Sequence, residues 1–516
     1  MNGLGQWALW LALAASAIGC WMAIAGGALR NRVVVRAGAS SLHTATVLVL
    51  LSLAALARAL WTSDFSILYV ASFSSLIVPR AYQLGALWGG PAGSLLIWTL
   101  CMACVASVAL FAHRRSFADR LSWFTAVLGA AVAVLAAATV FAGDPFARLS
   151  AEISEGRGLD PVLQSPWMLL HPPFLLLGTA ATLPLFASTV AAMAVRRCDD
   201  AWRAAVRSWS LVAFTLIVAG VVIGMRWAYA EPGWGGYWSW DPVEVAGAVP
   251  LVVLGVLVHV LRRRGTSPAE IAALSLAPFP LTLAGAWVAR SDALRTVHGF
   301  VQSSSGWVYA AMAIAAAGGA AALVVVRREW LAIVGTPGEA PRADAGMPVA
   351  ESALSGIARR LSHAGMILFV VAAAVMPFRR AVDAEIATGS RYATRDLFGR
   401  EWTFTSQGVS RYAHNNFYVS ALPMSVSSGG RRLGIVTTEE RQPLDAEENE
   451  LAAAIVRVGS RASLLQDVQV ELLGANEAGA RVRIRFWPLA SFLWLGGALV
   501  AFAGLLALVA GPRPPD

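Results

Sequence analysis

The sequence predicts an all-α polytopic membrane protein with about eleven transmembrane helices and a small all-β, barrel-like domain inserted before the last helix. Of the 516 residues, 57% are hydrophobic and only 14% are charged, as in polytopic membrane proteins. Apolar runs of about twenty residues, the length that a helix needs to cross a bilayer, recur between short polar loops. One late segment is polar instead and contains short β-type stretches, which indicates a domain outside the membrane.

The apolar runs set the expected domain boundaries. Residues 1–378 form a transmembrane bundle, residues 379–487 form the β-rich domain, and residues 488–516 form the final helix and a cytoplasmic tail. The expected spans lie near residues 4–29, 41–60, 91–112, 122–142, 169–195, 208–226, 243–262, 269–288, 306–326, 362–378 and 488–511. The first run has no basic start or small-residue cleavage site, so we expect it to be retained as a span.

The orientation of these spans follows from arginine alone, because all 40 residues counted as Lys or Arg are arginine. Arginine clusters follow the odd-numbered spans, and positively charged loops stay in the cytoplasm. The clusters are Arg30, Arg32 and Arg36; Arg114, Arg115 and Arg120; Arg196, Arg197, Arg203 and Arg207; Arg262 to Arg264; and Arg327, Arg328, Arg359 and Arg360. We therefore expect the N-terminus outside and the C-terminus inside. The net charge of +9 needs no nucleic-acid partner to explain it.

Two segments between spans differ from ordinary loops. Stretches such as Trp402–Thr405 and Val468–Leu472, separated by the Gly429-Gly430 turn signal, predict the strands of an extracytoplasmic domain. The Pro-, Gly- and Ala-rich stretch 335–350 is typical of a flexible cytoplasmic linker.

An aromatic run in segment 227–245 is the most informative motif. It reads Trp-Gly-Gly-Tyr-Trp-Ser-Trp-Asp-Pro-Val-Glu from Trp234 to Glu244, between two spans. Amphipathic rings are stable at the boundary of water and lipid, and glycines permit close approach. The run therefore fits a platform for a large planar ligand, although on composition alone an ordinary aromatic belt explains it equally well. Cys101 and Cys104 form a CxxC inside an apolar run, which favours packing, and the chain has no CxxCH of its own.

The histidines fall into two pairs when sorted by expected depth. His171 and His298 lie on the outer side, as the aromatic run does, whereas His259 and His363 lie near the cytoplasmic leaflet. Two imidazoles from separate helices can ligate one haem iron, so the pairs suggest two haem sites. A lone histidine is more often structural, and His43 could replace either inner ligand. We expect His113 to be solvated, and His414 has no assigned role.

The chain resembles the CcmF-type haem lyase subunits of the WWD-domain family, which handle haem in cytochrome c biogenesis. The resemblance rests on several blocks in the same order along the chain. They are 86–90 with 93–98, Leu170–Pro173, Gly233–Glu244, Ala289–Ser291 with Val297–Phe300, Leu361–Gly365 and Arg485–Pro488. The family pattern has a His-Glu pair where this chain has Pro91-Ala92, aromatics more often at Tyr237 and Ser239, and Asn at Val245. The chain is also shorter, with several helices absent between spans nine and ten, so it is a shortened or divergent member.

The resemblance implies a lyase that joins haem to the CxxCH thiols of apocytochrome c. It implies that His171 and His298 are axial ligands of the transferred haem b, while His259 and His363 hold a resident haem b that keeps the iron reduced, with quinol as a possible donor. The implied platform consists of Trp234, Gly235, Gly236, Tyr237, Trp238, Trp240 and Asp241. Implied partners are a CcmE-like haem chaperone, apocytochrome c and a CcmH- or CcmI-like thiol-presenting subunit. No residue is assigned as a catalytic acid or base, and Asp241 and Glu244 are candidates for orienting a loop or a histidine.

Two other functions compete with the lyase. A haem delivery subunit would share the platform and the outer histidines but would need neither the inner pair nor the β domain. An ion-translocating respiratory subunit is disfavoured, because such proteins carry Lys and Glu within several spans and these spans are almost free of acids. The expected location is the bacterial cytoplasmic (inner) membrane.

The arginine pattern makes a topology prediction. A reporter fused near Gly430 should be extracytoplasmic, and one fused near Pro341 should be cytoplasmic, because basic loops are retained inside. Paired phosphatase and fluorescent-protein fusions measure this. The opposite pattern would place the outer histidines and the aromatic run on the cytoplasmic side.

Overall fold

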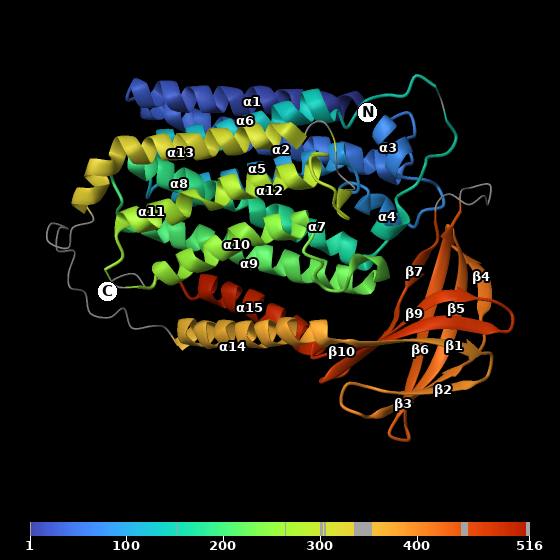
Figure 1. Cartoon of the computed structure of the whole chain (residues 1–516). Coiled ribbons are helices and arrows are strands. Elements are labelled where there is room, and N and C mark those ends of the chain that lie inside the picture. The colour runs from blue at the N-terminus through green and yellow to red at the C-terminus, as the bar shows by residue number, and fades with distance from the viewer. Residues whose placement is uncertain are drawn as a thin grey trace.

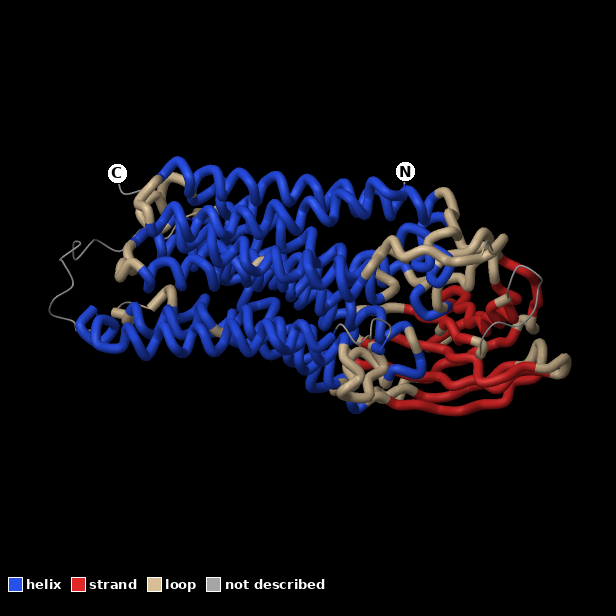
Figure 2. Tube along the Cα trace, turned by 90° about the horizontal axis from the view of Figure 1, so that it is seen from above, coloured by secondary structure: helices blue, strands red, loops and turns tan. Residues whose placement is uncertain are grey.

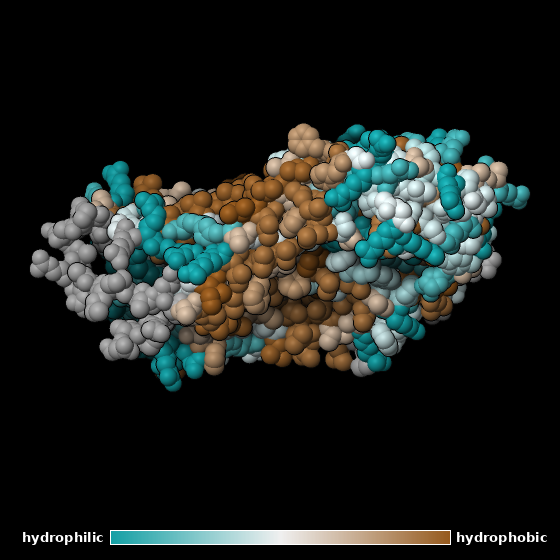
Figure 3. Space-filling view, turned by 90° about the horizontal axis from the view of Figure 1, so that it is seen from below, coloured by the Kyte–Doolittle hydropathy of each residue, from teal (hydrophilic) through white to brown (hydrophobic). Residues whose placement is uncertain are grey.

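A bundle of helices and a separate body of β-strands at one end of it make up the molecule (Figures 1 and 2). The computed structural model describes residues 2–151, 153–263, 265–299, 303, 306–334, 353–444 and 453–511. Within these ranges eleven helical segments are long and apolar enough to cross a membrane, as predicted. On the face shown in Figure 3, apolar residues cover the middle of the molecule and hydrophilic residues lie toward both ends. The predicted linker 335–350 and Phe300 lie outside the described residues.

The helices follow the predicted spans closely. They are α1 (Asn2–Ala28), α2 (Arg32–Trp61), α3 (Leu68–Phe73), α4 (Arg80–Gly85), α5 (Pro91–His113), α6 (Leu121–Ala138), α7 (Pro166–Ala180), α8 (Thr182–Ala194), α9 (Asp200–Ala230), α10 (Pro242–Val260), α11 (Pro268–Leu276), α12 (Pro278–Arg290), α13 (Trp307–Val334), α14 (Ala353–Val375) and α15 (Ala490–Val509). Helices α2, α9 and α14 begin eight or nine residues before the expected spans. The added N-terminal segments carry arginines, which end an apolar run but do not end a helix.

Two spans consist of two helices each. The fifth breaks at Ala181 between α7 and α8, and the eighth breaks at Ala277 between α11 and α12. Proline lacks an N–H and cannot bond to the carbonyl four residues earlier, so Pro184 and Pro278 account for these interruptions. The last turn of the fourth span, Thr139–Gly143, is a π-helix.

The β domain consists of two antiparallel sheets that share one hydrophobic core. One has the order β1-β10-β9-β8, and the other has β2-β3-β5-β6-β7, with β4 paired to β5. The strands are β1 (Arg380–Ala387), β2 (Arg391–Arg395), β3 (Glu401–Ser406), β4 (Ser410–His414), β5 (Phe417–Ser428), β6 (Arg431–Pro443), β7 (Ile455–Arg457), β8 (Gly459–Arg461), β9 (Gln466–Ala475) and β10 (Gly479–Pro488). Phe404, Met424 and Ile484 are fully buried between the sheets. The Thr438 hydroxyl of β6 accepts from the Leu472 N–H of β9, so the sheets also meet along an edge, as in a barrel.

The β domain docks on the end of α9 through buried polar contacts. Arg457 forms an ion pair with Glu231 and donates to the Gln164 carbonyl at 3.0 Å. Burial raises the pKa of the Glu231 carboxyl above its usual range, although Arg457 opposes this effect. The Tyr229 hydroxyl lies 3.3 Å from Asp467, and Gln469 donates to the Tyr229 carbonyl at 2.9 Å. These contacts hold the chain just before the aromatic run.

The Glu231–Arg457 pair provides a test of this docking. Arg457→Ala should lower the free energy of unfolding by about 3–5 kcal/mol, because it leaves a buried carboxylate without its cation. Glu231→Leu combined with Arg457→Leu should recover most of that loss, since it removes both charges. Exposed Arg481→Ala is the matched control and should stay within about 0.5 kcal/mol. Thermal unfolding in detergent is the measurement, and equal stability of Arg457→Ala and the control would contradict the docking role.

Candidate functional site

The aromatic run connects α9 to α10 at the β-domain end of the bundle. A 3₁₀ turn, Pro232–Trp234, is followed by Gly235 and Gly236 with φ of 82° and 113°, in the left-handed region that favours glycine. Gly236 also faces the indole of Trp487 on β10, and a Cβ there would lie 2.8 Å from the ring. The two glycines therefore let the run turn sharply beneath the β domain.

The run ends in a capping box on α10. Asp241 is the N-cap and accepts from the Val243 N–H at 2.9 Å. Glu244 accepts from the N–H groups of Ser239 at 2.9 Å and Asp241 at 3.2 Å, and from the Ser239 hydroxyl at 3.1 Å. These reciprocal bonds satisfy donors that a helix N-terminus leaves free, so the run is anchored to a rigid element.

Asp241 also orients the outer histidine His298. Its carboxylate accepts from the Thr296 hydroxyl at 2.6 Å and from the Val297 N–H at 3.0 Å, and lies 3.2 Å from His298 Nδ1. Burial tends to raise the pKa of Asp241, but the hydrogen bonds from Thr296, Val243 and Val297 outweigh it, so the pKa is lowered. The ionised carboxylate can only accept, hence Nδ1 carries the proton and Nε2 is left with a lone pair.

His171, the second outer histidine, lies on α7 against α9. Its Nδ1 is 2.8 Å from the Gly220 carbonyl, which can only accept, so Nε2 again keeps the lone pair. Gly224 makes room for the imidazole, because a Cβ at that position would lie 2.6 Å from His171 Cε1. The Gly220–Gly224 pair is thus a GxxxG contact that brings α7 and α9 close together.

An arc of two tryptophans joins the outer histidines. Ring centroids are 6.2 Å apart between His171 and Trp227, 4.9 Å between Trp227 and Trp234, and 5.4 Å between Trp234 and His298. A cavity of about 70 Å³ lies inside the arc, lined by both histidines, Trp227 and Trp238. The two imidazoles, whose Nε2 atoms form no hydrogen bond among the residues that the structure describes, therefore belong to one largely apolar site.

The remaining residues of the predicted platform do not form a single flat face. Trp238 lines the cavity and meets Trp240 edge to face at 6.1 Å, while Trp240 is 77% exposed. The Tyr237 hydroxyl donates to the Ala373 carbonyl of α14 at 2.7 Å. The run thus presents Trp234 and Trp238 to the histidines and uses Tyr237 and Gly236 to contact α14 and β10.

The inner histidines His259 and His363 come from α10 and α14, and their rings lie close together and nearly perpendicular. The centroids are 5.9 Å apart, at an interplanar angle of 76°. Each Nδ1 lies 2.8 Å from a carbonyl one turn earlier, of Gly255 and Arg359, so each Nε2 is available to a metal. One iron between two imidazoles, with bonds of about 2 Å, requires a separation of roughly this size. These residues therefore fit a bis-histidine haem. No cluster of three or more His, Cys, Asp or Glu among the described residues could hold a metal ion by itself.

The other histidines lie elsewhere. His43 lines a different cavity with α2 and α5 residues, away from α10 and α14. His113 accepts from Trp209 Nε1 at 3.1 Å and stacks on Phe117, so it is a packed residue and not the solvated one that the sequence predicted. His414 belongs to the exposed strand β4.

Sequence reasoning assigned neither Trp227 nor Gly224 to the outer site, although the predicted aromatic segment 227–245 includes Trp227. Both lie near the end of α9, which continues one turn beyond the expected boundary at residue 226. The GxxxG spacing of Gly220 and Gly224 was a usable signal, since it marks a close helix–helix contact.

Residues 88–291, which include His171 and the aromatic run, match the family described as cytochrome C assembly protein. The cytochrome c-type biogenesis protein CycK of Rhizobium meliloti is 36% identical over 311 residues, which cover 59% of this chain and 46% of that protein. CcmF of Escherichia coli is 36% identical over 250 residues, 48% of this chain and 38% of that protein. The chain thus spans less than half the length of these relatives.

A solved structure has a similar fold over almost the whole chain. It is titled cytochrome c heme lyase CcmF, and it aligns with a TM-score of 0.76 at 20% identity, covering 98% of this chain and 97% of that chain. At this identity the likeness concerns the fold alone.

Two glycines in the wall of the outer cavity form a matched pair for mutation. Gly224→Ala should cost about 1–3 kcal/mol and displace His171, because the added methyl overlaps the imidazole. Gly247→Ala, on α10 in the same cavity, adds a methyl with nothing within 4 Å and should be nearly neutral. Thermal unfolding in detergent measures both. Indistinguishable stabilities would show that Gly224 does not position the histidine.

Proposed function

We propose that the chain is a CcmF-type cytochrome c biogenesis protein that holds haem between His171 and His298 and helps to attach it to apocytochrome c. One observation carries the proposal. Two histidines from separate elements have Nδ1 satisfied and Nε2 free, at the two ends of one tryptophan arc. That arrangement suits a planar iron macrocycle, with axial ligands from the imidazoles and ring contacts from the indoles.

The chemistry needs positioning more than acid–base groups. Each cysteine thiol of a CxxCH adds across a haem vinyl C=C, so that a C–S and a C–H bond form and no group leaves. Glu244 is the acid that lines the cavity, and its hydrogen bonds to the aromatic run already occupy it. We therefore assign no catalytic residue in this chain. Its contribution is to hold the haem plane while a thiolate is presented, which can supply several orders of magnitude in rate.

Haem entry requires the aromatic run to move. The cavity of about 70 Å³ holds two or three waters, far less than a porphyrin. Gly235 and Gly236 are the natural hinge, since they lie between the Trp227–Trp234 contact and the capping box. Trp240 is exposed and is therefore available to contact the incoming group or its donor.

The inner pair is proposed to hold a resident haem b. His259 and His363 would be its axial ligands, which fits their spacing and their free Nε2 atoms. When bound, such a haem supplies one-electron transfer, here to keep the transferred iron reduced, with quinol as electron donor. His259 lies 17 residues along α10 from Pro242, about 25 Å from the outer site.

The proposed partners would approach the site from the side on which Trp240 is exposed. A CcmE-like chaperone would donate haem, and a CcmH- or CcmI-like subunit would present the apocytochrome thiols. Trp487 of the β domain lies against Gly236 of the aromatic run, which makes the domain a candidate guide for these partners.

The two histidine pairs should be separable by mutation. His171→Ala or His298→Ala should abolish holocytochrome c formation and leave a reduced b-type spectrum of the purified protein, because the sites are about 25 Å apart. His259→Ala or His363→Ala should remove that spectrum. Haem-stained cytochrome c and the optical spectrum, taken from one strain, are the paired measurement.

Each outcome of this assay has a distinct meaning. Normal cytochrome c maturation in the outer mutants would refute the lyase role and favour haem delivery to another acceptor. Full haem content in both inner mutants would refute the resident site, and His43 would be the next ligand to test.

Asp241 is proposed as a positioning residue for His298. Asp241→Asn should reduce holocytochrome c formation about 10–100-fold, because the amide no longer enforces the Nδ1–H tautomer. The resident b-type spectrum should stay unchanged, whereas a general folding defect would diminish both. Asp160→Asn, a helix cap in another outer loop, is the matched control. Equal activity of the two variants would contradict the positioning role.

A further inference from the structure

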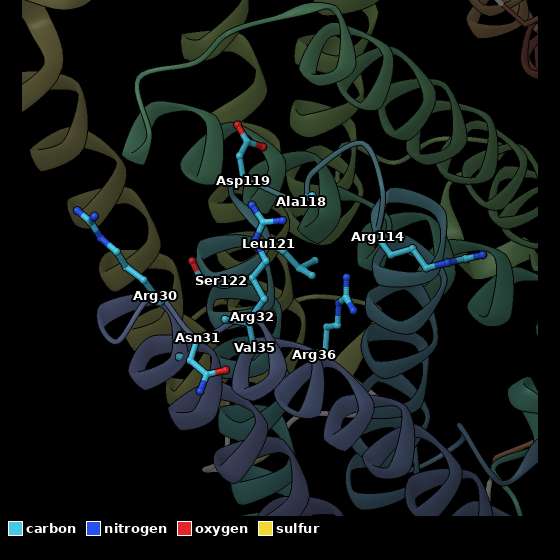
Figure 4. A pocket seen from close by; sticks show the side chains of 12 residues that line it. Arg30, Asn31, Arg32, Val35, Arg36, Arg114, Ala118, Asp119, Leu121 and Ser122 are labelled. Atoms are coloured by element: carbon cyan, nitrogen blue, oxygen red, sulfur yellow. The ribbon is translucent and has the colours of Figure 1, made fainter.

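A basic cavity of about 260 Å³ lies at the end of the bundle remote from the β domain. Its walls are the turn between α1 and α2 and the connection between α5 and α6 (Figure 4). Among the residues that line it are four arginines, Arg30, Arg32, Arg36 and Arg114. The positive-inside rule explains the sign of this charge, but it does not require arginines from separate connections to surround one cavity.

The positive charge of the cavity is not neutralised within the described residues. Asp119 is the one acid among its lining residues, and it is engaged by Arg120 and Arg197 at 3.1 Å each. No carboxylate of the described part of the chain forms an ion pair with Arg30, Arg32 or Arg36. The cavity therefore favours an anion from outside the chain.

The walls of the cavity are preorganised. Asn31 caps α2 by accepting from the Val33 and Val34 N–H groups at 3.0 and 3.3 Å, which holds the turn that carries Arg30 and Arg32. Gly27 lets the two connections approach, because a Cβ there would lie 2.9 Å from Ser122 Cβ. In Figure 4 Arg32 and Arg36 reach up toward the α5–α6 connection, and Arg30 and Arg114 extend outward on either side.

Apolar surface adjoins the cavity. A neighbouring cavity of about 340 Å³ shares Arg36 and Arg114 and is also lined by Leu110, Phe111 and Leu121. Phe111 is 64% exposed, and the Arg114 guanidinium lies 3.9 Å from its ring centroid. A ligand that fits both parts carries a negative head and an apolar body.

We propose that this cavity binds the headgroup of an anionic phospholipid from the leaflet predicted to be cytoplasmic. The phosphodiester lies between Arg32 and Arg36, and the acyl chains leave past Phe111. Guanidinium groups suit this role because they donate two parallel hydrogen bonds to phosphate oxygens. Basic pockets between transmembrane helices on this side of a membrane are a recurrent setting for such headgroups.

The test first compares ligands on the unmutated protein and then compares two double variants that remove the same charge. The purified full chain is delipidated in detergent, and phosphatidylglycerol, phosphatidylcholine or inorganic phosphate is added while binding is followed by native mass spectrometry and thermal unfolding. Phosphatidylglycerol should bind and raise the melting temperature, whereas phosphatidylcholine and phosphate should not. Arg32→Gln with Arg36→Gln should lose roughly 30-fold in affinity for phosphatidylglycerol. Arg263→Gln with Arg328→Gln removes the same charge on the same side, outside the cavity, and should retain the affinity.

Three results would overturn the proposal. An equal effect of inorganic phosphate alone would make the cavity a site for free anions. An equal loss in the control pair would show only general attraction of acidic lipid. Equal binding of phosphatidylglycerol and phosphatidylcholine by the unmutated protein would show that the cavity does not select an anionic headgroup. Should Arg32→Gln with Arg36→Gln fail to fold, Arg32→Lys with Arg36→Lys keeps the charge and should still weaken binding, because lysine cannot make the paired contacts.

Discussion

The Asp241 carboxylate is the interaction on which the outer site depends. It caps α10, receives two hydrogen bonds from the segment after α12, and faces His298. Because one ionised group makes all three contacts, it fixes the positions of the aromatic run, the start of α10 and His298 relative to one another. The buried hydrogen bonds that lower its pKa are the same bonds that fix the loop, so charge and geometry are coupled.

Much of the architecture was predictable because hydropathy and charge are local properties of a sequence. The eleven spans, the late β domain and the grouping of histidines by depth needed only run lengths, arginine positions and strand-type stretches. Helix ends were less predictable. Helices α2 and α14 begin with arginine-bearing turns, which lie outside the apolar runs that hydropathy identifies. The structure places His259 opposite His363, the proximity that equal depth had only suggested.

The side-chain arrangement of the outer site was not predictable, because it depends on contacts between distant segments. Trp227 belongs to the end of a helix and yet completes the arc with Trp234. Tyr237 was assigned to the platform from its place in the aromatic motif, but its hydroxyl donates to a backbone carbonyl that lies 136 residues further along the chain. The sequence predicted His113 to lie in a solvated loop, whereas its imidazole accepts a hydrogen bond from Trp209 Nε1.

That Tyr237 contact gives α14 a mechanical role. The helix carries His363, and ten residues later, about 15 Å along its axis, Ala373 accepts the Tyr237 hydrogen bond. Gly365 packs against the backbone of α15 at Gly496, so α14 and α15 approach closely near His363. Because His363 and Ala373 lie on one helix, a shift of α14 as a rigid body would move both His363 and the carbonyl that accepts the Tyr237 hydrogen bond.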